Sequence, residues 1–427
     1  MSLMVSNTVF ASSVAALFCV SNAFAEPNLP PPDLDHAVKH YSKVVGWPKG
    51  IQPKAPSGFS VTKFAEDLRS PRWIHVLDNG DVLIVEANTE PKDEDEIKEA
   101  LENGKIHSQH MGESANRITL FRDSDGNGRY DQRNVFLDGL KQPFGMEVMG
   151  EWFYVANTDS LMRYRYASGD QRISGEGEKL LELPAGGYNN HWTRNLLASP
   201  DGSKLYISVG SASNNGEYGM DEEKRRANIL VVNPDGSDEK VFAAGLRNPV
   251  GMDWAPGTQE LWTVVNERDD IGDELVPDYL AQVNEGEFYG WPYAYFGQHE
   301  DPRMAGERPD LVEKTLVPEV ALEAHSAALG LAFYDQNAFP ERYRNGAFIG
   351  QRGSWNRTEL SGYKVSFVPF EDGKPSGKTE EFLTGFIADA DQSLVYGRPV
   401  GLAVLPDGSL LVADDASGVV WQVKADG

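Results

Sequence analysis

The stretch PRWIHVLDNGDVLIVEA at Pro71–Ala87 decides the fold, because its pattern returns near the end of the chain as RPVGLAVLPDGSLLVADD at Arg398–Asp415. Each copy has a polar or proline-containing lead-in, an apolar strand, a tight turn and a second apolar strand. The turns contain Asn-Gly in the first copy and Asp-Gly in the second, residue pairs that tolerate the positive φ of hairpin turns. The strands are rich in Val, Ile and Leu, as half-buried pleated surfaces require. The repeated unit is therefore predicted to be a β-hairpin.

Similar units recur between these two copies. They are QPFGMEVMGEWFYVAN from Gln142, HWTRNLLASPDGSKLYISVG from His191, RNPVGMDWAPGTQELWTVVN from Arg247 and SAALGLAFY from Ser326. Six units with no linker between them predict an all-β fold, a single six-bladed β-propeller, with a two-sheet sandwich as the all-β alternative. Insertions between units fit loops, and we expect Lys92–Lys105 to form a short surface helix. The segment SVTKF at Ser60–Phe64 is expected to complete the last blade.

The first residues have the pattern of an export signal. Apolar VAALFCV at Val14–Val20 precedes Ala23-Phe24-Ala25, a small-x-small cleavage pattern. Residues 1–25 contain no Lys or Arg, so a frayed apolar terminus remains the alternative. We expect a signal peptide at 1–25, an N-terminal extension at 26–58 and the propeller at 59–427, in a periplasmic or secreted protein. No later segment approaches ~18 apolar residues, so no membrane span is expected.

Charge and cysteine content narrow the range of partners. The formal net charge is −26, and residues 1–25 carry none of it. An acidic surface of this kind repels nucleic acid and anionic lipid, so we expect neither as a partner. The single cysteine, Cys19, lies in the predicted signal peptide, so the mature chain would have no disulfide and no Cys-x-x-Cys-His haem attachment.

Cationic and imidazole residues occur at one phase of the repeat, in the lead-ins to the first strand of each unit. The innermost strand of a propeller blade lines the central channel, so these side chains are expected to converge at one end of it. Guanidinium groups match carboxylates or phosphates in bidentate geometry, which predicts a multiply anionic ligand. Arg352 and Trp355, in GQRGSWNR, add a further cation and an aromatic face for a planar ligand, although Trp355 packing between blades is an equal alternative. The lead-in residues are Arg72, His191, Arg247, Asn248, His325 and Arg398.

Two segments are candidates for cation binding. Asp123, Asp125 and Asn127 match the opening of a calcium loop, D-x-D-x-N-G. The twelfth position is Asn134 instead of a bidentate Glu, which disfavours an EF-hand and leaves a calcium-bound hairpin and an empty turn equally open. The second segment is NERDDIGDELVPD at Asn266–Asp278, just beyond a strand at the channel phase, with a solvated acidic loop as its alternative.

These blocks together resemble the glucose/sorbosone dehydrogenases, quinoproteins that carry pyrroloquinoline quinone (PQQ) on a six-bladed propeller. The likeness spans essentially the whole mature chain and is greatest to the L-sorbosone dehydrogenase-like branch. It is carried, in order, by YNNHWTRNL, GLRNPVGMDW, NERDDIGDELVPD, EGEFYGWPYAYFG, HSAALGLAFY, GQRGSWNR and GRPVGLAVLPDGSLLVADD.

The resemblance implies oxidation of an aldose sugar or a sorbosone-like aldehyde, with PQQ and Ca²⁺ as cofactors. Hydride would pass to C5 of the quinone, Ca²⁺ would act as Lewis acid, His191 as general base, and Arg247 would stabilise the developing negative oxygen. Electrons would then leave to an external cytochrome or quinone. The implied cofactor contacts are Arg247, Asn248, His325, Arg352, Trp355 and Arg398, and the implied calcium loop holds Arg268, Asp269 and Asp273, acting chiefly through backbone carbonyls.

Two other functions fit a propeller. A calcium-dependent hydrolase such as a lactonase would use the acidic clusters with His191 and His325, but it usually needs several carboxylates converging on the metal. A non-enzymatic binding module would use one face of the ring, since fold alone does not determine function.

Overall fold

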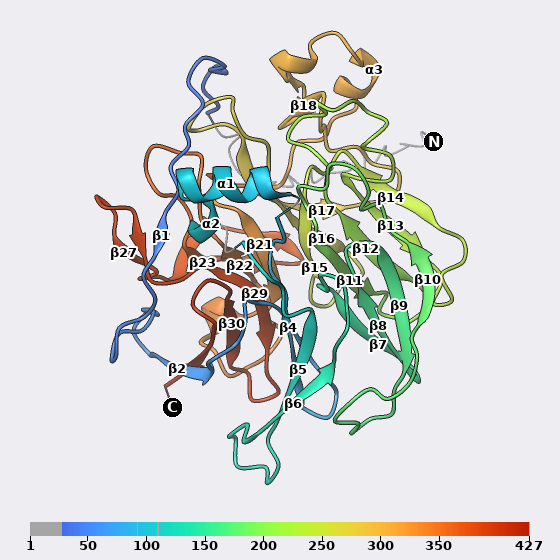
Figure 1. Ribbon diagram of the computed structural model, residues 1–427, viewed down its shortest axis with the longest axis vertical. Coiled ribbons are helices and arrows are strands. Elements are labelled where there is room, and N and C mark those ends of the chain that lie inside the picture. The colour runs from blue at the N-terminus through green and yellow to red at the C-terminus, as the bar shows by residue number, and fades with distance from the viewer. Residues whose placement is uncertain (1–27, 92, 109–110, 427) are drawn as a thin grey trace, which may run out of the picture.

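The computed structural model describes residues 28–91, 93–108 and 111–426, which are mostly strands with few helices (Figure 1). The all-β expectation is therefore confirmed. The predicted signal peptide at residues 1–25 lies outside the described residues.

The described residues form six four-stranded sheets, each antiparallel throughout. The sheets, in chain order, contain β3 (Pro71–Val76), β4 (Val82–Glu86), β5 (Arg117–Arg122) and β6 (Gln132–Leu137); β7 (Met146–Met149), β8 (Trp152–Ala156), β9 (Ser160–Arg165) and β10 (Glu178–Glu182); β11 (Arg194–Ala198), β12 (Leu205–Val209), β13 (Asn228–Val232) and β14 (Lys240–Ala244); β15 (Pro249–Trp254), β16 (Leu261–Val265), β17 (Pro277–Val283) and β20 (Val320–Ala324); β21 (Ala328–Phe333), β22 (Ala347–Gln351), β23 (Lys364–Val368) and β26 (Glu380–Leu383); and β29 (Pro399–Val404), β30 (Leu410–Asp414), β31 (Val419–Ala425) and β2 (Phe59–Ala65).

The first strands of all six sheets surround one axis. A cavity of about 340 Å³ is lined by residues of β3, β7, β11, β15, β21 and β29. Five of the six predicted units correspond to the first two strands of one sheet, and SAALGLAFY corresponds to the first strand, β21, alone. The repeat seen in the sequence therefore lies in the inner half of each sheet.

Small residues in the first strands allow the sheets to approach each other closely. A Cβ added to Gly330 on β21 would overlap the carbonyl oxygen of Val400 on β29. The glycine that recurs in the predicted units is therefore required by packing. The other contacts between first strands or their lead-ins are Trp73 with Phe144, Gly145 with Leu196, Asn195 with Val250, Gly251 with Leu331, and Gly401 with Arg72.

The last sheet joins the two ends of the described chain. β2 pairs antiparallel with β31, with Ser60 opposite Lys424 and Val61 opposite Val423. The expectation that Ser60–Phe64 completes the last sheet is confirmed. Because the chain runs directly from β2 into β3, the pairing of β2 with β31 fixes the last sheet beside the first.

The predicted surface helix is present as α1 (Glu94–Asn103). Asp93 caps it by accepting a hydrogen bond from the backbone nitrogen of Glu96, and Gly104 ends it with φ of 83°. The remaining short elements are β1 (Lys43–Val44), α2 (Lys105–Ser108), β18 (Ala294–Tyr295), β19 (His299–Glu300), η1 (Pro302–Met304), α3 (Pro309–Val312), η2 (Glu341–Tyr343), β24 (Phe370–Glu371), β25 (Lys374–Pro375), β27 (Ile387–Asp389) and β28 (Leu394–Val395).

Residues 28–58, here called the strap, run along the side of the molecule before β2 begins. β1 of the strap pairs parallel with β28, and Figure 1 shows this blue segment passing α1 and α2 on its way to β2. Trp47 anchors the strap: its ring packs edge-on against Phe386 and Trp421, and its Nε1 donates to Asp414 at 2.7 Å. The strap is therefore part of the folded domain.

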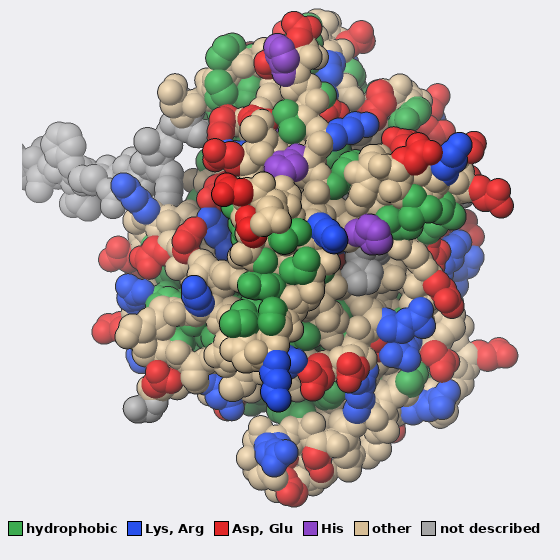
Figure 2. Space-filling view, turned by 60° about the vertical axis from the view of Figure 1, so that its left-hand side comes forward, with side chains coloured by type: hydrophobic (Ala, Val, Ile, Leu, Met, Phe, Trp, Pro, Cys, Tyr) green, Lys and Arg blue, Asp and Glu red, His purple; other side chains and the backbone are tan. Residues whose placement is uncertain are grey.

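Surface charge is mixed on the face shown in Figure 2, where acidic and basic side chains are interspersed. No helix within residues 28–91, 93–108 and 111–426 has both the length and the apolar character of a membrane span.

Candidate active site

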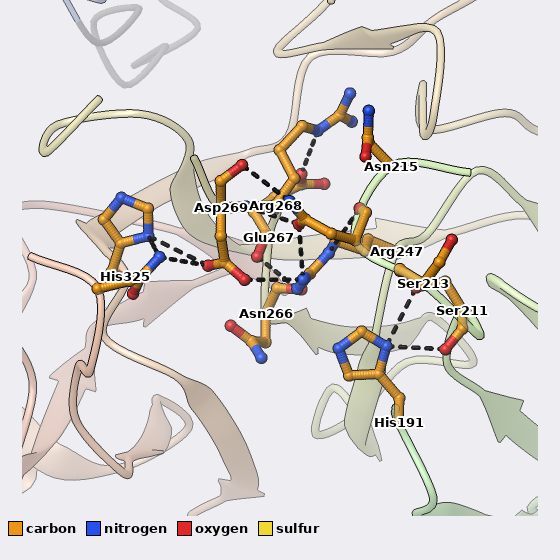
Figure 3. Close-up of polar contacts among 12 residues, drawn as sticks. His191, Ser211, Ser213, Asn215, Arg247, Asn266, Glu267, Arg268, Asp269 and His325 are labelled. Carbon is orange, nitrogen blue, oxygen red and sulfur yellow. Dashed lines mark hydrogen bonds and ion pairs between the residues drawn. The ribbon is translucent and has the colours of Figure 1, made fainter. Parts of the chain in front are cut away.

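His191 lies in the lead-in to β11, where its imidazole is fixed by one neighbour. Its Nδ1 is 2.8 Å from the carbonyl oxygen of Ser211 and 3.0 Å from the Ser211 hydroxyl. A carbonyl oxygen can only accept, so Nδ1 carries the proton and Nε2 is left with its lone pair. Figure 3 shows Nε2 on the side of the ring turned away from Ser211.

Burial keeps the His191 imidazole neutral. Desolvation, followed by the nearby Arg247 guanidinium, lowers the pKa of His191 to about 3. At neutral pH the ring is therefore uncharged, and Nε2 can accept a proton.

Buried Arg247 and partly buried Asp269 form an ion pair beside His191. Arg247 is 1% exposed, and its Nη2 lies 3.0 Å from Oδ2 of Asp269. Its other nitrogens donate to backbone carbonyls, among them that of Glu267 at 2.6 Å. Burial opposes ionisation of Asp269, but the Arg247 charge and a hydrogen bond with His325 outweigh it and hold the pKa of Asp269 at about 2. The Asp269 carboxyl group is therefore ionised at neutral pH.

His325 approaches Asp269 from the side opposite Arg247 (Figure 3). Its Nε2 donates to the carbonyl oxygen of Gly272 at 3.0 Å, and its Nδ1 lies 3.4 Å from Oδ1 of Asp269. Burial lowers the pKa of His325, but the hydrogen bond and charge of Asp269 raise it overall. Asn356 donates to the same carboxylate oxygen at 2.6 Å. Asp269 is therefore the centre of a network joining loops of several sheets.

Three further predicted arginines gather around Asp415. Arg72 and the Nε of Arg352, the latter at 2.7 Å, both donate to Oδ2 of Asp415. Arg398 donates to the carbonyls of Ser108, Arg352 and Gly353. Burial is the main cause that lowers the pKa values of Arg72 and Arg398 to about 10. Repulsion from neighbouring guanidinium groups lowers both values further. Several cations are thus held close together in a buried region.

Trp192 connects this arginine cluster to His191. It directly follows His191, and the Arg72 guanidinium lies 5.2 Å from its ring centroid. The Trp192 Nε1 donates to the hydroxyl of Thr89 at 3.0 Å, which fixes the ring. The cationic cluster and the candidate base therefore flank one indole ring.

Two buried polar atoms in this region have no hydrogen-bond partner among the described residues. They are Nε of Arg72 and Oδ1 of Asn248. Asn248 lies next to His191, because a Cβ added at Gly210 would meet both of their side chains. Buried polar atoms are normally paired, so these two are suited to a polar ligand.

The predicted calcium loop is ordered, but its groups are already engaged. The Arg268 side chain is fully buried in ion pairs with Glu267 and Asp301. The carbonyl oxygen of Arg268 accepts one long bond, 3.5 Å from the Val276 nitrogen, within the described chain. The carbonyl of Asp269 accepts from Asn214 and Arg303 at 3.0 and 2.9 Å, while the Asp273 side chain accepts from the Thr358 nitrogen at 3.1 Å.

The Asp123 loop is separate from this site. It connects β5 and β6, at the opposite end of the molecule from α1 in Figure 1. Asp123 accepts hydrogen bonds from the backbone nitrogens of Gly126, Asn127 and Gly128, and Asp125 accepts from Asn127. Within the described ranges, no three His, Cys, Asp or Glu side chains gather in a way suited to a metal ion.

Trp355, which was predicted to offer an aromatic face to a planar ligand, stacks on the side chain of Tyr41. Its ring lies 5.6 Å from that of Tyr41, with an interplanar angle of 10°. Tyr41 belongs to the strap, so an aromatic residue far away in sequence meets the segment GQRGSWNR.

A family model described as "Domain of unknown function (DUF7133)" matches residues 52–423. The chain belongs to this family. Among curated proteins, an uncharacterized protein of Borreliella burgdorferi is 28% identical over 66% of this chain and 76% of its own length. The Escherichia coli aldose sugar dehydrogenase YliI is 25% identical over 57% of this chain and 62% of its own length. A pyrroloquinoline quinone-dependent pyranose dehydrogenase of Coprinopsis cinerea is 22% identical over 90% of this chain, which spans just 56% of that enzyme.

Solved structures show the same fold. The holo form of the pyranose dehydrogenase PQQ domain from Coprinopsis cinerea matches with a TM-score of 0.69 at 20% identity, covering 90% of this chain and 100% of that one. The PQQ-bound aldose sugar dehydrogenase of Streptomyces coelicolor matches with a TM-score of 0.56 at 16% identity, covering 87% and 99%. The predicted resemblance to PQQ-dependent sugar dehydrogenases is thus confirmed, and with it the β-propeller as the shared fold.

Several residues of the candidate active site were not predicted from the sequence. They follow the second strand of a unit, as Ser211 follows β12 and Asp415 follows β30, or they belong to the strap. Since antiparallel strands return to the same edge, the end of a second strand lies beside the lead-in of its own first strand, as Ser211 lies beside His191 and Asp415 beside Arg398. The polar residue after each second strand was the available signal. The missed residues are Tyr41, Ser211, Asn214, Asn356 and Asp415.

Proposed function

We propose that this protein is a PQQ-dependent dehydrogenase that oxidises an aldose sugar or a sugar-derived, sorbosone-like aldehyde. The observation that carries the proposal is a neutral His191, with Nε2 available, beside the ion pair of Arg247 and Asp269. A neutral imidazole with a lone pair on Nε2, next to a fixed cation, is suited to accept a hydroxyl proton while the cation stabilises the negative charge that develops on the oxygen. The named dehydrogenases among its relatives support the same reaction class.

The arginine cluster is the proposed holder of the quinone. Arg72, Arg352 and Arg398 lie close together, and burial first and repulsion between the guanidinium groups after it lower the pKa values of Arg72 and Arg398. The three carboxylates of PQQ would relieve this repulsion, and the unpartnered Nε of Arg72 is a further donor for them. Arg398 would act mainly by its charge and by holding the backbone of Arg352 in place. Trp355 and His325 are proposed to border the same region.

Bound PQQ would supply the redox chemistry by taking up a hydride from the substrate carbon. His191 would accept the substrate hydroxyl proton at Nε2, while its Nδ1 proton stays on the Ser211 carbonyl. Arg247 would stabilise negative charge on the substrate oxygen, and Asn248 would orient a polar group through its unpartnered Oδ1. Asp269 and His325 would keep Arg247 in position.

Ca²⁺ is proposed as the second cofactor, bound with the quinone. The Arg268 carbonyl, which accepts one long bond in the described chain, suits a hard cation. The Asp269 carbonyl could contribute after exchanging its bonds from Asn214 and Arg303, and Asp273 lies in the same loop. Asp123, Asp125 and Asn127 remain a proposed second site, in which the ion would replace the backbone donors now bound to Asp123.

We also infer that residues 59–427 form one closed, six-bladed ring. The six four-stranded sheets, the shared central cavity and the β2–β31 pairing support this reading. Export by a signal peptide at 1–25 to the periplasm or exterior, and electron transfer to an external cytochrome or quinone, are part of the same proposal. No feature of the described residues favours the hydrolase alternative, since they contain no converging set of metal-binding side chains.

Reconstitution tests the proposal. The purified protein, given PQQ and Ca²⁺, is expected to reduce a redox dye when supplied with aldoses or sugar-derived aldehydes. Activity should fall after treatment with a chelator and return with Ca²⁺. Absence of both quinone binding and dye reduction across a broad sugar panel would refute the proposal, and lactone hydrolysis without quinone would favour the hydrolase.

A further inference from the structure

The strap contacts several loops that carry candidate site residues. The backbone nitrogen of Asp33 donates to the carbonyl of Ile271, two residues after Asp269, at 2.9 Å. The nitrogen of His40 donates to the carbonyl of Trp355 at 2.6 Å, and Ser42 accepts from the Tyr363 hydroxyl at 2.8 Å. The strap therefore joins the loop after β16 to the loop after β22.

His40 fixes the loop that contains Trp355. Its Nδ1 is 2.9 Å from the carbonyl oxygen of Thr358 and 3.1 Å from that of Arg357, so it donates to this loop. Its Nε2 contacts the hydroxyl of Ser393, next to β28. With both ring nitrogens engaged, His40 sets the position of its neighbour in sequence, Tyr41.

Tyr41 is the strap residue that enters the site region. Its ring is half-buried and stacks on Trp355 with an interplanar angle of 10°. Burial, and then the charges of Glu99, Asp269 and Asp270, raise the pKa of Tyr41 to about 12. Trp355, on which Tyr41 stacks, is followed by Asn356, which donates to Oδ1 of Asp269 at 2.6 Å. Tyr41 therefore lies against the loop that contacts the Arg247–Asp269 pair, with a partly exposed aromatic ring and a protonated hydroxyl.

We propose that Tyr41 is a specificity-determining residue that binds the ring of a pyranose substrate, placed at the site by the strap and by its stack on Trp355. The inference rests on the proposed function and names the form of sugar that the site accepts. An aromatic face is complementary to the weakly positive C–H face of a sugar ring, and the tyrosine hydroxyl can hydrogen-bond to a sugar oxygen. An open-chain aldehyde offers no such face and gains little from Tyr41.

The test compares Tyr41→Ala and Tyr41→Leu with the wild-type holoenzyme. For D-glucose, both variants are expected to raise KM about fivefold, the value of one lost aromatic contact, with a smaller effect on kcat. KM for the open-chain substrate D-glyceraldehyde should change less than twofold. Tyr41→Phe keeps the ring and is expected to keep most of the affinity for glucose. PQQ affinity, measured by quenching of tryptophan fluorescence, should be the same in all four proteins.

A matched control is Tyr130→Ala. Tyr130 is also half-buried and pairs with an aromatic ring, that of Phe64, but it follows the distant Asp123 loop. The Tyr130→Ala variant should leave KM for glucose and for glyceraldehyde unchanged. If Tyr41→Ala does not fold, the KM values of Tyr41→Leu, which keeps an apolar side chain, test the inference instead.

Two results would overturn the inference while leaving the proposed function intact. One is an unchanged KM for glucose in both Tyr41→Ala and Tyr41→Leu. The other is an equal rise in KM for glucose and glyceraldehyde together with weakened quinone binding, which would make Tyr41 a support for the cofactor. If the wild-type protein neither binds PQQ nor oxidises any sugar, the proposed function itself fails, and this inference fails with it.

Discussion

The carbonyl oxygen of Ser211 accepts a hydrogen bond from Nδ1 of His191 at 2.8 Å, while the Ser211 nitrogen donates to the carbonyl of Arg247 at 2.7 Å. One residue thus fixes the tautomer of the candidate base and the backbone of the adjacent cation. The arrangement depends on main-chain atoms, so it is a property of the fold at this position.

His191→Ala should abolish most turnover and leave quinone binding intact. Removal of a general base typically costs about 10²–10⁴-fold in rate. The measurement is dye-linked kcat together with PQQ titration by fluorescence. Turnover within twofold of wild type would exclude His191 as the base.

The pH dependence of kcat/KM should reflect the lowered pKa of His191. A general base works when it is deprotonated, and burial lowers the pKa of His191 to about 3. Activity limited by this group should therefore persist as the pH falls below 6 and should decline only toward pH 3. A decline centred near the ordinary histidine pKa of about 6.5 would contradict the neutral, buried imidazole.

Asp415→Asn should destabilise the fold by about 3–5 kcal/mol, because it removes a buried negative charge from between cations. Arg72 and Arg352 both donate to this carboxylate, which is fully buried. The free energy of unfolding in denaturant measures the loss, and the exposed Asp221→Asn is the control. A loss no larger than that of the control would show that the arginines do not depend on Asp415.

Gly330→Ala should lower stability by about 1–3 kcal/mol through overpacking between two first strands. The added methyl group would overlap the carbonyl oxygen of Val400 on β29. Gly186→Ala is the matched control, since a Cβ there has nothing within 4 Å. Equal melting temperatures for the two variants would argue against close contact of β21 with β29.

Sequence reasoning predicted the fold well because its evidence is local. A hairpin with a glycine in its first strand is encoded within about twenty residues, and the repeat of that unit makes the assignment independent of any single turn. The recurring glycine also allows neighbouring sheets to approach closely. The sequence did not indicate this role, which the packing of Gly330 against Val400 shows.

The site was predicted only in part, since its partners are distant in sequence. The lead-in phase pointed to a single convergence of cationic and imidazole groups, and in the structure His191 lies near Arg247 and Arg72 near Arg398. It gave no information on which carboxylates would oppose them, because Asp269 and Asp415 follow second strands, β16 and β30, and so lie outside the lead-in phase. The stack of Tyr41 on Trp355 joins residues more than three hundred positions apart, and no periodicity predicts such a contact.

The most direct test is anaerobic reduction of the reconstituted protein by sugar, followed through the absorbance of the bound quinone. Wild-type protein loaded with PQQ and Ca²⁺ is expected to lose the absorbance of the oxidised quinone after addition of an aldose. His191→Ala, loaded to the same extent, should retain it over the same period. A wild-type protein that binds the quinone but shows no absorbance change with any sugar or sugar-derived aldehyde would contradict the proposed reaction.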